Sequence, residues 1–162
     1  MTKLRMWLWL LLGTLAILTT LGSVARSRAL FGGEPWFTSG ACLVTFTDAQ
    51  GNFVAREVIA LHADHTMSAV DSGQDGPQYF YSSQLGAWKL DGPGKIIGKT
   101  FDFNYPPGSG LARLDFVLNL TPDRRHLTGT VNIYYLPLET ENPQEGGTLV
   151  LTYNVAGEFF QP

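Results

Sequence analysis

The fold of this chain is decided by one stretch, 111-LARLDFVLNL-120, in which apolar and polar residues alternate. One face carries Ala112, Leu114, Phe116, Leu118 and Leu120. The other face carries Arg113, Asp115 and Asn119. Because successive side chains of a strand point to opposite faces, the stretch predicts a β-strand with one dry side and one wet side.

Similar runs, each ended by a turn signal, recur along the chain. The other predicted strands are 41–47, 53–62, 67–71, 85–90, 95–105, 127–136 and 148–160. No window in this region has a sustained helical period, and short connections favour antiparallel neighbours. We therefore expect an all-β fold, a single antiparallel up-and-down eight-stranded barrel, because closure removes the exposed sheet edges. A two-sheet sandwich is the alternative, and the barrel is preferred because the connections are hairpin-like and no long crossover is needed.

The N-terminal segment is predicted to lie outside the barrel. Lys3 and Arg5 precede an almost wholly apolar stretch, which ends in Ser23-Val24-Ala25. This pattern is typical of a cleaved secretory signal, whereas an apolar length of about 20 residues also fits a retained membrane anchor. We expect a signal or anchor at 1–25, a linker at 26–40 and the barrel domain at 41–162. The protein is then extracytoplasmic, either secreted or tethered to the membrane through residues 6–25.

The charge, the cysteine count and the short motifs argue against several kinds of partner and site. The formal net charge of −3 provides no basic patch, so no nucleic-acid partner is expected. With a single cysteine, Cys42, the chain forms no internal disulfide. His62 and His65 are three residues apart at a strand end, so their side chains are expected to diverge rather than share a metal, unless the turn folds them back. The sequence has no Gly-rich phosphate loop or Gly-x-Ser-x-Gly elbow, and we predict no metal site and no cofactor.

The eight-strand meander, with Gly40-Ala41-Cys42 in its first strand and Gly86-Ala87-Trp88 in its fourth, resembles the calycin superfamily of lipocalin-like barrels. Lipocalins themselves have Gly-x-Trp in the first strand, where this chain has Cys42. The resemblance is therefore to lipocalin-like barrels in general. It implies binding of a small apolar ligand, as in many members, or the cyclase or isomerase chemistry of some.

Candidate site residues follow from the predicted dry faces and from the longest loop. Directional contacts and apolar area for a ligand are expected from Phe46, Tyr79, Tyr81, Trp88, Phe101, Phe103, Phe116, Tyr135 and Tyr153. Glu57 is the candidate catalytic acid or base, with Tyr153 as its partner. The strand 53–62 is apolar on both faces, however, so either Glu57 or Arg56 could face inward. Burial would raise the pKa of an inward Glu57.

Three functions remain open from the sequence. The first is a carrier that holds a small hydrophobic molecule inside the barrel. The second is a cyclase or isomerase in which Glu57 or Tyr153 moves a proton. The third is a structural domain whose interior is filled by its own side chains. A cavity would exclude the third function. Within a cavity, an inward Glu57 within hydrogen-bond reach of Tyr153 or Trp88 would favour the second function, and a purely apolar lining would favour the first. The sequence sets neither the ligand nor the oligomeric state.

Overall fold

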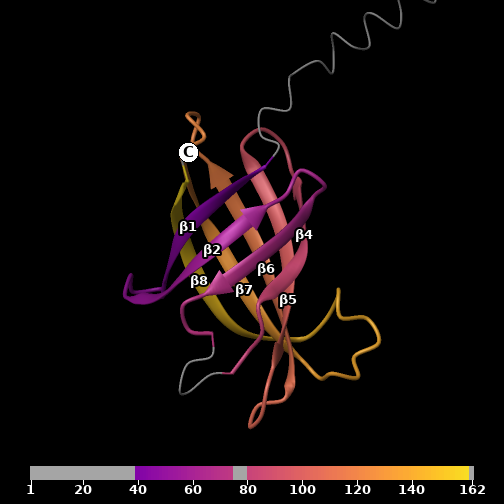
Figure 1. Cartoon of the computed structure of the whole chain (residues 1–162). Helices are drawn as coiled ribbons and strands as arrows, with labels where there is room; N and C mark the ends of the chain where they lie inside the picture. Colours follow the sequence, from indigo (N-terminus) through magenta and orange to yellow (C-terminus); the bar gives the residue numbers. More distant parts are fainter. Residues whose placement is uncertain (1–38, 75–79, 161–162) are drawn as a thin grey trace, which may run out of the picture. The chain divides into compact units, whose positions relative to one another are not determined.

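The computed structural model describes residues 39–74 and 80–160. These residues form an all-β structure (Figure 1), with β1 (Gly40–Thr47), β2 (Phe53–Leu61), β3 (Thr66–Asp71), β4 (Gln84–Leu90), β5 (Lys95–Asn104), β6 (Gly110–Leu120), β7 (His126–Leu136) and β8 (Thr148–Phe159). Within the described ranges, no helix has the length and apolar character needed to cross a membrane. The predicted signal or anchor at 1–25 lies outside the described residues.

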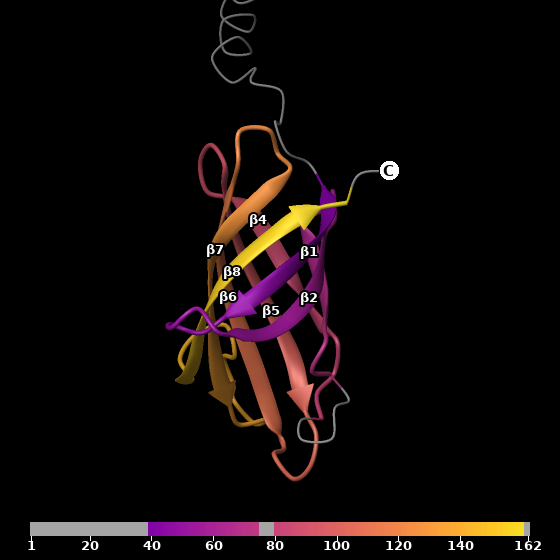
Figure 2. The ribbon, with the colours of Figure 1, turned by 90° about the vertical axis from the view of Figure 1, so that its left-hand side faces the viewer.

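Each strand pairs antiparallel with the next, and β8 pairs with β1 to close the barrel. Figure 2 shows β8 and β1 side by side along this seam, where Cys42 lies opposite Phe159 and Phe46 lies opposite Val155. The predicted up-and-down eight-stranded barrel is therefore confirmed, and a two-sheet sandwich is not formed. Every strand end falls within one residue of the sequence-based expectation, because Gly, Pro, Asn and Asp mark the turns in the sequence.

One half of the barrel has a solid core. This half lies next to the connections 62–65, 91–94 and 121–125, and we call it the closed end. Its inward side chains are buried and include Cys42, Ile59, Leu61, Met67, Trp88, Ile96, Phe116, Leu118, Leu127 and Phe159. The Trp88 indole Nε1 donates a hydrogen bond of 3.0 Å to the carbonyl oxygen of His62, and its ring lies 5.1 Å from that of His65. Trp88 thereby seals the closed end.

Two inward glycines let neighbouring side chains fill the barrel axis. A Cβ atom on Gly157 would lie 2.5 Å from Cγ1 of Val44, and one on Gly98 would lie 2.8 Å from Sδ of Met67. Both distances are too short for real side chains, so any larger residue would displace its neighbour. The closed end is therefore a packed core with no room for a ligand.

The opposite end, which we call the mouth, is bounded by the connections that follow Thr47, Asp71, Asn104 and Leu136. Inward-facing side chains reach solvent here: Leu151 is 46% exposed and Tyr135 is 41% exposed. Register shifts occur near the same end, between Phe46 and Thr47 and between Ile133 and Tyr134. Such bulges bend strands and are common at barrel rims. The inner wall is thus accessible from the mouth.

The side chains of β5 face the opposite way from the sequence-based expectation. Thr100 and Asp102 are buried inside the barrel, whereas Phe103 is 55% exposed on the outer wall. Phe101 shares this outer face by strand alternation, so the inward placement of Phe101 and Phe103 was wrong. The reason is that Ile96 and Gly98 face the core, which fixes the direction of every later residue in the strand.

A segment after β7, residues 137–147, lies against the outer wall. Lys99 Nζ donates a hydrogen bond of 2.6 Å to the Gln144 carbonyl oxygen, and Arg113 Nη1 donates one of 3.2 Å to that of Pro143. The Arg113 guanidinium also lies 4.3 Å from the centre of the Tyr134 ring, a cation–π contact. Arg113 is buried by these contacts although it is on the outer face, and it holds the segment in place.

Candidate functional site

Three carboxylates gather inside the barrel near the mouth, and we call Glu57, Asp71 and Asp102 the acid cluster. Glu57 lies directly opposite Asp71 in the pairing of β2 with β3. Asp102 comes from β5, two residues before the end of that strand. Glu57 is 1% exposed and Asp102 is 5% exposed, whereas Asp71 is half-buried. The cluster therefore extends from the mouth towards the packed core.

Glu57 is the most unusual member of the cluster. Among the described residues, neither of its carboxylate oxygens has a hydrogen-bond partner, although both are fully buried. Desolvation, followed by the charge of Asp71, raises the pKa of Glu57 from 4.5 to about 8. The Gln84 amide lies near enough to offset part of this shift, but it falls short of hydrogen-bond geometry with either oxygen. Glu57 is consequently neutral at pH 7.

Asp102 has a similar environment. Burial and the charge of Asp71 raise the pKa of Asp102 from 3.8 to about 7. Its Oδ1 atom is buried and has no hydrogen-bond partner in the part of the chain that the structure describes. Burying polar atoms without partners costs free energy, and burying several acids together costs more. The barrel therefore holds two destabilising acids next to each other at its mouth.

Asp71, in contrast, is held by hydrogen bonds. The Tyr81 hydroxyl and the backbone N–H of Gly73 both donate to its Oδ1 atom, each at 2.5 Å. Tyr81 is positioned by an antiparallel β-bridge to Asn104, the last residue of β5. Burial and the hydrogen bond to Asp71 raise the pKa of the Tyr81 hydroxyl well above its ordinary value, so it remains a donor. This arrangement fixes one carboxylate while the other two remain unpaired.

A polar pair lies next to the cluster. The Thr100 hydroxyl donates a hydrogen bond of 2.8 Å to the Gln84 side-chain oxygen, and both residues are buried. The side-chain oxygen of Gln84 accepts the hydrogen bond from Thr100, so the NH₂ group of Gln84 is the part of the amide on the side of Glu57. The amide can donate hydrogen bonds to an incoming ligand or to the ionised form of Glu57.

An apolar and aromatic wall faces the mouth. Phe46 and Tyr153 stack with ring centroids 6.2 Å apart and planes inclined by 18°. Leu151 and Ile133 are paired in register and follow Tyr153 and Val131 towards the rim. Tyr135 lies at the rim itself, where its hydroxyl donates a hydrogen bond of 2.9 Å to the Ser109 carbonyl oxygen. The mouth therefore offers apolar and aromatic surface together with the acid cluster.

The structure brings together only some of the predicted site residues. Glu57, Phe46, Tyr81, Tyr135 and Tyr153 all lie in the half of the barrel nearest the mouth. Trp88 and Phe116 are inward but belong to the packed closed half, and Phe101 and Phe103 lie outside the barrel. Tyr79 lies outside the described residues. The acid nearest to a tyrosine hydroxyl is Asp71, with Tyr81, rather than Glu57 with Tyr153.

Sequence reasoning missed four polar residues of the site, namely Asp71, Gln84, Thr100 and Asp102. With Phe101 and Phe103 expected to face inward, strand alternation placed Thr100 and Asp102 on the opposite, outer face. The signal that could have reversed this assignment is Lys99, which shares its strand face with Phe101 and Phe103. A lysine inside an eight-stranded barrel would need a buried partner, so its face is expected to be the outer one.

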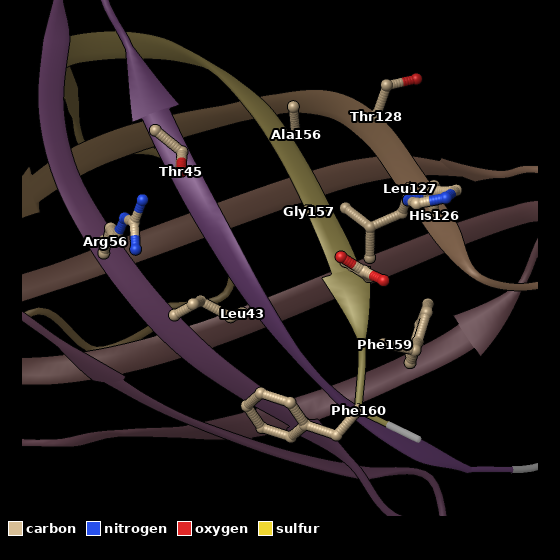
Figure 3. A pocket seen from close by; sticks show the side chains of 11 residues that line it. Leu43, Thr45, Arg56, His126, Leu127, Thr128, Ala156, Gly157, Phe159 and Phe160 are labelled. Atoms are coloured by element: carbon tan, nitrogen blue, oxygen red, sulfur yellow. The ribbon is translucent and has the colours of Figure 1, made fainter.

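A hollow lies on the outside of the barrel. It is an open groove of about 640 Å³ (Figure 3), lined by residues of β1, β2, β7 and β8 that include Arg56, His126 and Glu158, and by Phe160, which follows β8. Figure 3 shows Leu43, Thr45 and Phe160 around it. The groove lies on the other side of the barrel wall from the acid cluster. It lacks the unpaired buried acids that distinguish the mouth.

Among the residues described, no group of three or more His, Cys, Asp or Glu side chains is arranged to hold a metal ion. The carboxylates therefore lie close enough to influence one another but do not surround a single coordination point. Comparisons with protein families, with curated proteins and with solved structures found no match to this chain. The class that the fold itself defines is a closed eight-stranded antiparallel barrel, compatible with the calycin architecture, with an acidic mouth.

Proposed function

We propose that this protein binds a small amphiphilic molecule in the mouth of its barrel. The observation that carries the proposal is Glu57, which is fully buried with both oxygens unpartnered. An isosteric glutamine or an apolar residue would cost less free energy there. Residues that break the rules of stable packing cluster at functional sites. A ligand that supplies the missing partners explains why the acid is there.

The two parts of the mouth suit the two parts of such a molecule. The polar group lies against the acid cluster, and the apolar part lies against Phe46, Tyr153 and Leu151. This division follows the usual design of small-molecule sites, with an apolar lining and a few convergent polar groups. The packed closed half sets the depth, because nothing can pass Trp88 and Phe116. The ligand therefore enters and leaves through the mouth.

Titration with the neutral fluorescent amphiphile prodan tests the proposal. Prodan emission should shift to the blue on mixing with the protein, and Leu151→Trp should weaken binding at least tenfold by filling the mouth. The matched control is Leu138→Trp, because Leu138 is similarly exposed (54%) but lies on the 137–147 segment. Equal binding by wild type and Leu151→Trp would contradict a site at the mouth. Native mass spectrometry of protein from its own cells would then identify the natural ligand.

A second function, acid catalysis, is favoured by the raised pKa of Glu57. A carboxylic acid that is neutral at pH 7 can donate a proton to a bound substrate, as a cyclase or isomerase requires. If the protein is an enzyme, Glu57→Gln should abolish turnover of the co-purified molecule and leave prodan binding within threefold. Turnover should also fall as the pH rises above about 8, since Glu57 then loses its proton. Unchanged turnover by Glu57→Gln would exclude this role.

A further inference from the structure

Among the described residues, the interior of the barrel carries acidic side chains but no basic one. By strand alternation, Arg56 lies on the outer face next to inward Glu57, and Lys99 lies on the outer face next to inward Thr100. Arg113 is also on the outer wall, beneath residues 137–147. The histidines of the described residues occupy strand ends and connections, namely His62, His65 and His126. No described residue therefore supplies a positive charge to the acid cluster.

We propose that the polar group of the ligand is a protonated primary amine, which binds among Glu57, Asp71 and Asp102. This inference rests on the proposed function and names the chemical class of its ligand. An ammonium group has several N–H donors and a positive charge, and among the described residues Glu57 and Asp102 have buried carboxylate oxygens without a hydrogen-bond partner. A neutral hydroxyl or carbonyl would pair with one acid and leave the others unpaired, and an anion would be repelled.

The aromatic residues at the mouth favour an organic cation over a metal ion. Tyr153 and Phe46 form a stacked aromatic pair, and Tyr135 adds a third ring at the rim. Aromatic faces attract ammonium groups, and they also cover the hydrocarbon stem of an amine. A bare metal ion would instead need oxygen ligands around one point, which the described residues do not form. An alkylamine or arylalkylamine fits both parts of the mouth.

Amine binding is expected to release protons. The groups that face Glu57 are Cys42 from β1, Asp71 from β3, Gln84 from β4 and Asp102 from β5, with Tyr81 beside Asp71. None of these groups is a cation, so the empty site keeps Glu57 neutral at pH 7. An ammonium favours the ionised carboxylates and lowers their pKa values. Amine affinity should therefore rise between pH 6 and pH 8, with about one proton released at pH 7.

Isothermal titration of the full chain with 4-phenylbutylamine and its neutral counterpart 4-phenylbutan-1-ol tests the inference. The amine, like a lysine side chain, stays protonated below about pH 10. At pH 7.5 it should bind at least tenfold more tightly than the alcohol. Titrations in two buffers of different ionisation enthalpy should count the released proton. Glu57→Gln should reduce the preference to less than threefold, whereas Glu141→Gln, at an exposed loop position, should leave it unchanged.

The outcomes separate the two proposals. Equal or tighter binding of the alcohol, or prodan binding that the amine cannot displace, would overturn the amine proposal and leave the proposed function intact. Absence of binding by the amine, the alcohol and prodan would overturn both. If Glu57→Gln does not fold, Asp102→Asn takes its place, because Asp102 is the second acid with an unpaired oxygen. An undiminished amine preference in the folded variant would also contradict the proposal.

Discussion

Replacing Glu57 with glutamine should stabilise the protein at alkaline pH and reduce the dependence of its stability on pH. In the unfolded chain Glu57 loses its proton near its ordinary pKa of 4.5, but in the folded barrel it keeps the proton up to about pH 8. Between these values the folded state binds more protons than the unfolded state. The contribution of Glu57 to the free energy of unfolding is therefore highest below pH 4.5 and falls as the pH rises.

The size of the effect follows from the shift. Between the two pKa values of a group, each pH unit lowers the free energy of unfolding by about 1.4 kcal/mol. Glu57 alone therefore lowers it by roughly 4 kcal/mol between pH 5 and pH 8. Asp102, whose pKa rises from 3.8 to about 7, adds a similar slope below pH 7. Glu57→Gln should remove the decline between pH 7 and pH 8, and about half of the slope between pH 5 and pH 7.

Urea unfolding followed by far-ultraviolet circular dichroism at pH 5, 6, 7 and 8 measures these slopes. Glu141→Gln is the control for a change of one charge, and it should keep the wild-type decline. The reasoning is refuted if wild-type stability is flat or rises across this range. It is also refuted if Glu57→Gln shows the same decline as wild type. Either result would mean that the buried carboxyl does not hold its proton in the folded barrel.

Three further predictions concern stability and reactivity. Phe116→Ala should lower the free energy of unfolding in urea by about 3–5 kcal/mol, because the ring is fully buried. Phe103→Ala, on the outer wall, should change it by less than about 1 kcal/mol. Similar costs for the two variants would contradict the assigned faces. Arg113→Leu should lower the free energy of unfolding by about 1–3 kcal/mol and increase proteolysis within 137–147. The reason is that the hydrogen bond to the Pro143 carbonyl oxygen and the contact with Tyr134 are lost. Unchanged proteolysis would argue against this anchoring. Cys42, whose pKa is raised to about 12 mainly by burial, should react with Ellman's reagent only after unfolding, and rapid labelling of native protein would disprove its burial.

The sequence predicts the barrel well because the strands carry most of their information locally. Alternation in 111–120 identifies a dry face, and it is confirmed by the burial of Leu114, Phe116 and Leu118. The turns are marked by residues such as Gly51 and Gly92, whose positive φ values of 85° and 93° suit tight connections. Local signals of this kind need no knowledge of the closed structure.

The site was less predictable because it depends on closure. β5 has aromatic residues on one face and polar residues on the other, and hydrophobicity alone selects the wrong face as inward. Asp71 and Asp102 come from strands separated by a third strand, so their proximity appears only when the sheet is curved into a barrel. The orientation of Glu57 could not be settled because β2 is apolar on both faces. In each case the inward side chains at the mouth do not follow the rule that the apolar face of a strand is the inward one.

The position of the chain ends has a practical consequence. Ser39 precedes β1 and Phe160 follows β8, and the N–H of Phe160 donates a hydrogen bond of 2.9 Å to the Ala41 carbonyl oxygen, so both ends of the described chain meet at the closed end. An affinity tag, a fluorescent fusion or a surface attachment joined directly before Ser39 or directly after Phe160 would meet the barrel away from its mouth. A short linker between the two ends would permit circular permutation with new termini in 121–125. The barrel is thus suited to immobilised binding assays that leave its entrance free.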